Sequence, residues 1–460
     1  MTTPRSRRRQ LHTTVSLLAA GALIAACAPG SDVDNGDGDD QQDQEVSTDI
    51  EALGEVTLTV WDQEIRGGQN EQIEQLNDAF TETYPNITIQ RNSQSFDDLE
   101  TTLRGALTGD DAPDVVQANN TRGTMGAFVA AGLLTDLDPY AEAYGWRERF
   151  SDTVLAQASY STDGTVFGDG DLYGLPQVGE VVGVFYSRDA LDEAGIDEEA
   201  LTTGTWSDFE DALVSAQEAG QVPMMLGNLD AWPAAHVFGP IQGQHVDPEQ
   251  IALLGMGNEG ASWTTPENEA AAEHLQDWVE AGYFNEGPNG TDYDAAWDSF
   301  AGGEGTFLMA GSWLAADIET AMGDDVGFFV PATEDAALVT TGGTGLPFAI
   351  TEQSPNADAA GAYLDFLTSD EAMEILAETG NMPINNTAEL APESGVNADV
   401  FRAFGETSEN GYLLPYLDWA TPSMGDTIGA ALQDLIAGQS DPQEFTEVLE
   451  DDYAAFVAGD

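Results

Sequence analysis

Two tryptophans of this 460-residue chain stand close to carboxylates in the sequence, and these residue types together could contact a ligand. Trp61 precedes Asp62, and Trp232 lies two residues after Asp230. An aromatic ring offers a large apolar face, while a carboxylate accepts hydrogen bonds from hydroxyl groups. These pairs predict contacts with a ligand that has both apolar faces and hydroxyl groups.

The elements that must position these residues begin with a half-buried strand at 56–60, where apolar residues alternate with threonines. Helical periodicity follows at 73–84 and 96–107, and short apolar strands follow at 87–89 and 115–116. This order of strands and helices predicts an α/β fold with a mainly parallel sheet and right-handed crossovers. Ligands bind at the carboxyl ends of such strands, where the first tryptophan–aspartate pair stands.

The segment after the third predicted strand adds three polar side chains at the same edge: Asn119, Asn120 and Arg122. Asparagine can donate and accept, and arginine donates hydrogen bonds in a planar fork. For Arg122 the alternative is a surface position paired with one of the many acids. Further helices are predicted at 267–281 and 358–378.

The first 26 residues have the layout of a signal peptide. Four arginines among the first nine residues precede an apolar stretch at 15–26, which is shorter than the roughly 20 residues that span a bilayer. The stretch ends in Ile-Ala-Ala-Cys, which resembles a bacterial lipobox and predicts that Cys27, the only cysteine, is diacylated. Residues 6–11 also resemble a twin-arginine signal, so both export routes stay open.

Residues 27–50 consist mostly of Asp, Gly, Gln and Ser. Such a segment buries too little apolar surface to offset its ordering entropy, so it predicts an acidic, flexible tether. The chain would then be held on the extracellular face of the cytoplasmic membrane. The remaining residues, about 410, are enough for two or three domains.

The charge balance is strongly acidic, with 83 Asp and Glu against 12 arginines and no lysine. Removing the signal peptide takes away four arginines and no acid, which leaves a net charge near −75. Such a surface repels nucleic acid and anionic lipid. It suits a protein bathed in concentrated salt, where counterions screen the repulsion, and an alkaline habitat is the alternative.

Seven short motifs follow one another at characteristic distances along the chain. They are Ala-Pro-Asp-Val-Val at 112–116, Ala-Gly-Leu-Leu-Thr-Asp-Leu-Asp at 131–138, Tyr-Gly-Leu-Pro at 173–176 with Val-Phe-Tyr-Ser-Arg-Asp at 184–189, Thr-Trp-Ser-Asp-Phe at 205–209, Gly-Thr-Phe-Leu-Met at 305–309 with Gly-Ser-Trp at 311–313, the segment 360–369, and Asn-Met-Pro at 381–383. In this order the chain resembles the bacterial extracellular sugar-binding proteins of the maltose-binding type, the family 1 solute-binding proteins.

The resemblance implies a type II periplasmic-binding-protein fold, in which two α/β lobes are joined by hinge strands and hold a sugar between them. It implies a first lobe at 51–178 plus 331–368, and a second lobe at 183–326 plus 369–460. It also implies capture of a sugar, which we expect to be a neutral oligosaccharide. Delivery would be to the permease subunits of an ATP-driven importer, with no enzymatic activity, metal or cofactor.

The resemblance also assigns site residues. Arg122 matches an arginine that lines the cleft, Glu180 matches a glutamate beside the hinge, and Trp313 matches a tryptophan that stacks on sugar. Trp419 lies where the family places a late aromatic residue. The family's acidic residue just before the arginine is Thr121 here, so that end of the pocket must be built differently.

Two other classes of protein remain as alternatives. A glycosidase would use a pair of carboxylates, but with 83 acids such pairs occur by chance. The four histidines lack zinc-ligand spacing, and no serine stands in a nucleophile elbow. A surface adhesion lipoprotein is the second alternative, which the two-lobe pattern disfavours.

Overall fold

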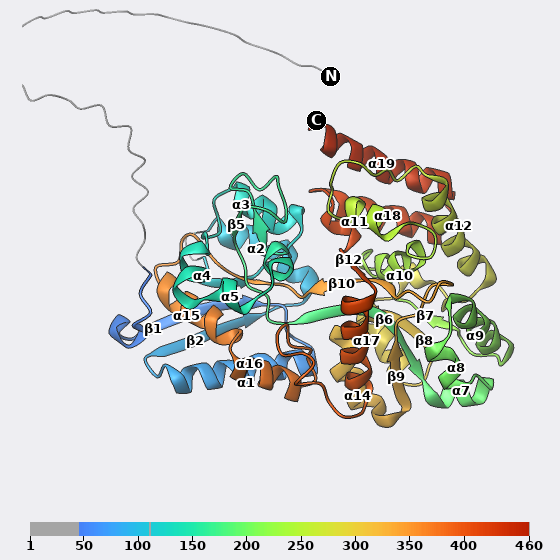
Figure 1. The fold of residues 1–460 in the computed structure, drawn as a ribbon, viewed down its shortest axis with the longest axis horizontal. Helices are drawn as coiled ribbons and strands as arrows, with labels where there is room; N and C mark the ends of the chain where they lie inside the picture. Colours follow the sequence, from blue (N-terminus) through green and yellow to red (C-terminus); the bar gives the residue numbers. More distant parts are fainter. Residues whose placement is uncertain (1–45, 110–111, 460) are drawn as a thin grey trace, which may run out of the picture. The chain divides into compact units, whose positions relative to one another are not determined.

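The computed structural model describes residues 46–109 and 112–459. The signal peptide, the attachment residue Cys27 and most of the tether lie outside these residues, so their assignment stays a prediction. The described chain forms two main sheets flanked by helices (Figure 1). Within the described ranges, no helix combines the length and the apolar sequence needed to cross a membrane.

The first sheet has the strand order β11-β3-β1-β2. Its strands are β1 (Val56–Asp62), β2 (Ile87–Ser93), β3 (Val115–Gln117) and β11 (Phe348–Ile350). Strand β1 pairs in parallel with β2 and β3, whereas β11 is antiparallel to β3. Its helices are α1 (Gly67–Thr83), α2 (Phe96–Leu107), α3 (Ala127–Ala130), α4 (Asp138–Tyr144), α5 (Trp146–Arg149), α6 (Asp152–Ala156), α15 (Ala357–Leu367) and α16 (Asp370–Glu378). The strand–helix alternation predicted for the start of the chain is confirmed.

The second sheet has the order β12-β10-β6-β8-β7, and β9 pairs with β6 off this path. Its strands are β6 (Gly179–Ser187), β7 (Met224–Met225), β8 (Phe307–Gly311), β9 (Val326–Phe329), β10 (Val339–Thr344) and β12 (Tyr412–Leu414). Strand β6 is antiparallel to β8, β9 and β10, so this sheet is mixed rather than mainly parallel. The lobe boundaries stay a prediction. The structure adds that β10, which lies in the range 331–368 predicted for the first lobe, pairs with strands of the second sheet.

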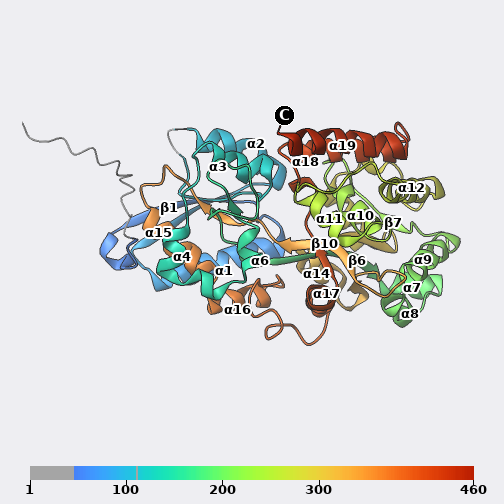
Figure 2. The same ribbon diagram turned by 45° about the horizontal axis from the view of Figure 1, so that its top comes forward.

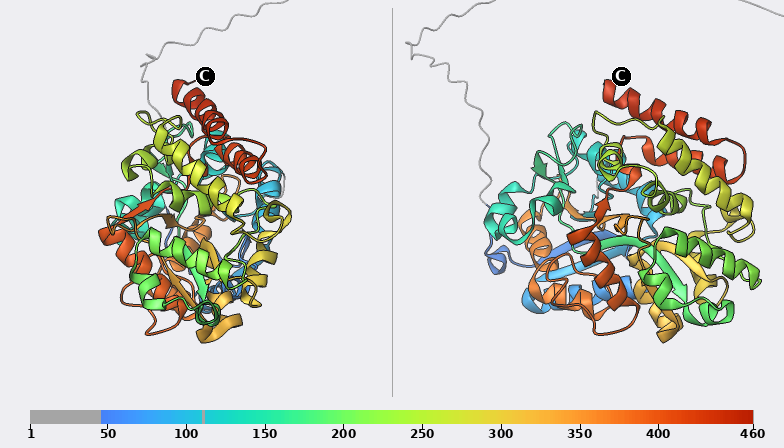
Figure 3. Two further views of the ribbon diagram at one scale, coloured as in Figure 1. Left: turned by 90° about the vertical axis from the view of Figure 1, so that its right-hand side faces the viewer. Right: turned by 45° about the vertical axis from the view of Figure 1, so that its right-hand side comes forward.

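Helices surround the second sheet on its outer sides. They are α7 (Arg188–Ala194), α8 (Glu198–Thr203), α9 (Trp206–Glu218), α10 (Pro233–Gln242), α11 (Pro248–Gly255), α12 (Pro266–Ala281), α13 (Tyr293–Ala301), α14 (Ala315–Met322), α17 (Val396–Asn410), α18 (Met424–Ile436) and α19 (Pro442–Ala458). Helix α19 packs beside α18 and α12, as Figures 2 and 3 show. A two-stranded ribbon pairs β4 (Ser159–Tyr160) with β5 (Asp171–Leu172).

The helix predicted at 358–378 is two helices, so that prediction is wrong in its extent. Helix α15 ends at Leu367, and α16 begins at Asp370. Between them Ser369 has extended backbone, and its hydroxyl accepts a hydrogen bond from the backbone N–H of Ala372 at 3.2 Å. A serine in this role begins a new helix, which apolar periodicity alone does not reveal.

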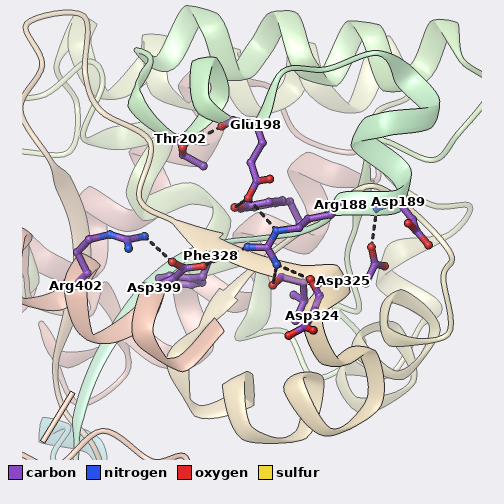
Figure 4. A network of polar contacts seen from close by, with 11 residues as sticks. Arg188, Asp189, Glu198, Thr202, Asp324, Asp325, Phe328, Asp399 and Arg402 are labelled. Carbon is purple, nitrogen blue, oxygen red and sulfur yellow. Dashed lines mark hydrogen bonds and ion pairs between the residues drawn. The ribbon is translucent and has the colours of Figure 1, made fainter. Parts of the chain in front are cut away.

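The motif at 184–189 has a structural explanation in a polar network around Arg188 (Figure 4). The guanidinium donates to Glu198 Oε1 at 2.9 Å, to the carbonyl oxygen of Asp324 at 2.7 Å, and to that of Val326. It also lies 3.7 Å from the carboxylate of Asp399. Arg188 therefore ties the start of α7 to α8, β9 and α17.

Candidate functional site

Four aromatic side chains from three parts of the chain meet beside the second sheet. Trp313 donates from Nε1 to the hydroxyl oxygen of Tyr293 at 2.8 Å. The rings of Trp232 and Tyr293 have centroids 4.5 Å apart, and that of His236 lies 5.2 Å from Trp313. Two predicted site residues, Trp232 and Trp313, are thus brought into one cluster, whereas Tyr293 and His236 were missed. We call these four residues the aromatic cluster.

Local structure fixes the positions of the two tryptophans. Trp232 immediately precedes α10, after Ala231 with a φ of 68°. Trp313 lies in a short 3-10 helix (Ser312–Leu314) that follows β8. A Cβ atom on Gly311 would lie 2.0 Å from the Trp313 ring, so the indole occupies space that only a glycine leaves open.

The predicted Asp230 serves the local fold. Its Oδ2 accepts a hydrogen bond from the backbone N–H of Tyr293 at 3.2 Å, at the start of α13. A carboxylate here satisfies a helix N–H that would otherwise lack a partner. Asp230 therefore helps to position Tyr293 within the aromatic cluster.

The predicted Glu180 lies close to the cluster on β6. Its Oε2 accepts a hydrogen bond from the hydroxyl of Tyr416 at 3.3 Å, and the Tyr416 ring lies 5.3 Å from His236. Burial raises the pKa of Glu180 to about 8, and the charge of nearby Glu64 adds to the increase, which the Tyr416 hydroxyl partly offsets. Sequence reasoning missed Tyr416, because a lone tyrosine after a short strand has no distinguishing pattern.

A second carboxylate, Glu64, was also missed. It is buried just beyond β1, and its Oε1 accepts a hydrogen bond from Gln117 Nε2 at 2.7 Å. Its Oε2 is buried without a hydrogen-bond partner among the described residues. Burial is the main reason that its pKa rises to about 7. The available signal was its position, two residues beyond the Trp61–Asp62 pair at the carboxyl end of a strand.

Asp62, another predicted site residue, is enclosed by protein partners and hydrogen-bonds to the backbone of Glu64. The Asp62 side chain is fully buried and accepts hydrogen bonds from Arg91 Nε at 2.7 Å and from Ser93 Oγ at 2.9 Å. Its Oδ1 also accepts the backbone N–H of Glu64 at 3.0 Å. These partners occupy Asp62 and fix the loop that carries Glu64. Trp61 is half-buried on β1 and packs against the hydrophobic core.

Arg122 is buried, and its donors face backbone carbonyls. It donates to the carbonyl oxygens of Thr165 at 2.6 Å, Met256 at 2.7 Å and Ala420 at 3.0 Å. Its guanidinium lies 4.8 Å from the centroid of the Phe456 ring. The residue is therefore not a surface arginine paired with an acid, and three of its five N–H donors are used by backbone carbonyl oxygens.

The remaining predicted residues lie outside the aromatic cluster. Asn120 is buried and donates from Nδ2 to the carbonyl oxygen of Gln157 at 2.9 Å. Asn119 is half-buried, and its backbone carbonyl oxygen accepts a hydrogen bond from the backbone N–H of Met125 at 3.0 Å. Trp419 is buried and packs behind Tyr416, with ring centroids 5.3 Å apart. These three residues support neighbouring segments in this structure.

One arginine joins a helix of the first sheet to a helix of the second sheet beside the aromatic cluster. Arg66, just before α1, donates from Nη2 to Asp294 Oδ1 on α13 at 2.8 Å. Its guanidinium also lies 5.6 Å from the centroid of the Tyr293 ring. Nearby, Phe96 at the start of α2 packs edge-on against Trp232, with centroids 6.0 Å apart. Residues from helices of the first sheet therefore contact the aromatic cluster of the second.

Together these residues offer aromatic faces beside carboxylates. Burial lowers the pKa of His236 to about 4, so its ring is neutral near pH 7.

The described residues contain no group of three or more His, Cys, Asp or Glu side chains that could hold a metal ion. A surface pocket of about 530 Å³ lies elsewhere, where α1, α14 and α16 meet.

Comparison with known proteins places the chain in a family. The family model described as bacterial extracellular solute-binding protein matches residues 67–374. An uncharacterized ABC transporter extracellular-binding protein of Pyrococcus horikoshii is 23% identical over 318 residues, which are 65% of this chain. The match spans 64% of that relative, slightly less than two thirds of its length.

Solved structures share the fold. A chitin oligosaccharide binding protein is 21% identical with a TM-score of 0.73, over 88% of this chain and all of that chain. The bacterial solute receptor AcbH, described as preferring β-D-galactopyranose, is 19% identical with a TM-score of 0.74, over 88% of this chain and all of its own. UgpB from Mycobacterium tuberculosis, in complex with glycerophosphocholine, is 19% identical with a TM-score of 0.70, over 88% of this chain and 98% of that chain. At these identities the likeness shows the fold alone.

The fold class predicted from the sequence is thereby confirmed, and so is the resemblance carried by the seven motifs. The family model covers more than half of the chain. The protein belongs to the bacterial extracellular solute-binding protein family, whose members are non-catalytic substrate-binding proteins of ABC transporters and not enzymes.

Proposed function

We propose that this protein captures a sugar outside the cell and delivers it to the membrane permease of an ATP-driven importer. The observation that carries the proposal is the aromatic cluster beside Glu180 and Glu64, with Trp313 and Trp232 half-buried. Ring faces of this kind pack on the C–H faces of a sugar, and the carboxylates accept its hydroxyl groups.

Closure of two lobes would complete the site. The Arg66–Asp294 ion pair and the Phe96–Trp232 contact both join the surroundings of α1 and α2 to the aromatic cluster. A ligand favours a closed form only through contacts that the open form lacks. In this proposal the sugar supplies those contacts by touching residues from both sides at once.

Several solved structures with the same fold support a sugar as the ligand class. They include the chitin oligosaccharide binding protein, the galactopyranose-preferring receptor and a protein in complex with raffinose. The sequence favours a neutral oligosaccharide, because a chain with 83 acids and 12 arginines repels phosphorylated and uronic sugars.

The proposed location rests on residues 1–50. A signal peptide, diacylation at Cys27 and an acidic tether would hold the binding domain near its permease on the extracellular face of the membrane. Lipoprotein diacylation supplies two acyl chains, and stable anchoring requires more than one. Labelling with a radioactive fatty acid, and its loss in Cys27→Ala, would test this part directly.

A thermal-shift screen in molar salt tests the ligand class. Mono- and oligosaccharides would each be added at increasing concentration, and a ligand present at a hundred times its Kd should stabilise the fold by about 2.7 kcal/mol. Hits would be confirmed by calorimetry with recovery of the intact sugar. A screen in which no sugar raises the melting temperature would favour the adhesion lipoprotein instead.

A further inference from the structure

The two carboxylates beside the aromatic cluster have little compensation from the protein. Oε2 of Glu64 is buried without a partner among the described residues. Glu180 accepts one described hydrogen bond, from the neutral hydroxyl of Tyr416 at 3.3 Å. Gln117 Nε2 donates to Glu64 Oε1 at 2.7 Å and lies 3.5 Å from the carbonyl oxygen of Leu346. A Cβ on the adjacent Gly345 would lie 2.8 Å from Glu180 Oε1, so the two carboxyl groups lie beside the same segment, and the charge of Glu64 adds to the rise in the pKa of Glu180.

The nearby arginines are committed to other acids. Arg91 donates to Asp62 through Nε at 2.7 Å and through Nη2 at 2.8 Å. Arg66 donates to Asp294 through Nε at 3.0 Å and through Nη2 at 2.8 Å. Each arginine is thereby paired with an acid of its own. The charge of Arg66 still lowers the pKa of Glu64, but burial outweighs it, so neither Glu64 nor Glu180 has a cationic partner that keeps its pKa low.

The side chains around these carboxylates also favour a cation. The faces of Trp and Tyr rings attract positive charge, and the attraction increases when the site excludes water. Trp313, Tyr293 and Tyr416 all belong to this neighbourhood, because they contact one another directly or through His236. His236 is itself neutral near pH 7, so it supplies no competing charge.

We propose that the ligand is an amino sugar, whose protonated amine lies against Glu64 and Glu180 while its ring packs on Trp313. The inference rests on the proposed sugar-binding function, and it replaces the expectation of a neutral oligosaccharide with that of a positively charged sugar. Hydroxyl groups of a neutral sugar would satisfy the carboxyl oxygens but bring no positive charge. The pKa values of about 7 for Glu64 and about 8 for Glu180 would then stay raised, and much of the pair would remain protonated near pH 7. A protonated amine supplies charge-assisted hydrogen bonds as well as the missing charge.

Matched ligands isolate the contribution of the amine. Calorimetry at pH 7 would compare glucose, N-acetylglucosamine and glucosamine, and then the β-1,4-linked trimers of the same three sugars. Within each series only the substituent at one carbon changes, from hydroxyl to acetamide to ammonium. The amino member should bind at least tenfold tighter than the hydroxyl member, and the acetamide should not reproduce the gain.

Variants locate the effect. Glu64→Gln and Glu180→Gln keep the side-chain shape and remove the charge, so each should reduce the preference for the amine to less than about threefold. Glu74→Gln on the exposed face of α1 is the matched control and should leave the preference unchanged. An unchanged preference in both site variants would assign the amine to a different place and overturn the inference.

The outcomes separate this inference from the proposed function. A hydroxyl sugar that binds as tightly as its amino counterpart overturns the amino-sugar inference and leaves sugar capture standing. Binding of putrescine or spermidine with no binding of any sugar overturns both. Tighter binding of the amino member, lost in the two site variants, supports both.

Discussion

Arg122 donates from Nε to the carbonyl oxygen of Ala420 at 3.0 Å, which joins a residue beyond β3 of the first sheet to one beyond β12 of the second. The same guanidinium binds the carbonyl oxygens of Thr165 and Met256. A Cβ on Gly257, whose φ is 64°, would lie 1.9 Å from the Ala420 oxygen, so the close approach of these segments requires a glycine. Arg122 thus holds segments from both sides of the molecule together.

Replacing Arg122 with glutamine should favour a more open form. Hydrogen bonds from a charged donor contribute about 1.5–3 kcal/mol each, and the variant loses at least two of them. Spin labels at the exposed positions 74 and 448 would report the distance between α1 and α19 in the ligand-free protein. The variant should show longer or broader distances, and its sugar affinity should fall because closure becomes less favourable.

Arg402→Gln is the control for this experiment. Arg402 is exposed and paired with Asp399 on its own helix, so its loss should leave the label distances unchanged. Identical distance distributions for wild type and Arg122→Gln would show that the three carbonyl contacts do not hold the two sides together.

Trp313→Ala should weaken sugar binding by about 1–3 kcal/mol, the scale of one well-packed aromatic contact. Trp313 is half-buried, so the ligand-free melting temperature should change little. Trp146→Ala is the contrasting variant, because that ring is fully buried and its loss should cost about 3–5 kcal/mol of stability. Melting temperatures and dissociation constants of both variants check the expectation. A large ligand-free destabilisation by Trp313→Ala with affinity intact would remove Trp313 from the site.

Gly311→Ala tests the same tryptophan without altering its chemistry. The new methyl group would overlap the Trp313 ring, so the indole must move and sugar affinity should fall nearly as far as in Trp313→Ala. Gly105→Ala is the control, because open space surrounds this helical position and alanine favours a helix. Affinity measured by calorimetry should fall in the first variant alone.

Sequence order and periodicity predicted the architecture well, because the first three strands and their helices arise from short-range apolar patterns. The tryptophan–carboxylate pattern identified Trp232, and the family resemblance identified Trp313, which meets it in the aromatic cluster, and Glu180 close beside it. The mixed character of the second sheet was not predictable, because the direction of β6 relative to β8 depends on pairing across more than a hundred residues.

The rest of the candidate site depends on tertiary contacts that leave no local pattern. Glu64 is one of 83 acids, and its place just beyond the Trp61–Asp62 pair does not reveal that its side chain is buried with one oxygen unpartnered among the described residues. Arg122 and Asp62 have the residue types of ligand contacts, but partners far away in the sequence use much of their hydrogen-bonding capacity. Such use of donors and acceptors follows from the folded geometry and not from residue type.

Salt should stabilise the protein steeply. The excess of carboxylates over arginines makes the folded surface repel itself at low ionic strength, and screening shortens the repulsion to about 3 Å at 1 M. The melting temperature should therefore rise as KCl increases from millimolar to molar concentration. A temperature that stays flat or falls over this range would argue against adaptation to concentrated salt.

Glu180 should make stability fall as pH rises. Burial raises its pKa from 4.5 to about 8, so the folded protein binds this proton more tightly than the unfolded chain does. The contribution is full below about pH 4.5 and is lost as pH increases through about 8. Glu180→Gln removes the titration while its amide oxygen can still accept the Tyr416 hydroxyl. The variant should therefore lose less stability than wild type between pH 5 and pH 9.

Wild type and Glu180→Gln share the general repulsion among surface acids. The difference between their melting temperatures at each pH therefore isolates the titration of Glu180. Glu74→Gln, on the exposed face of α1, should follow wild type across the same pH range. If Glu180→Gln also follows wild type, the carboxyl group titrates as an ordinary exposed glutamate. Glu180 would then be an ordinary solvated carboxylate at pH 7 and not a buried group that lacks a cationic partner, and a neutral ligand would be the better expectation.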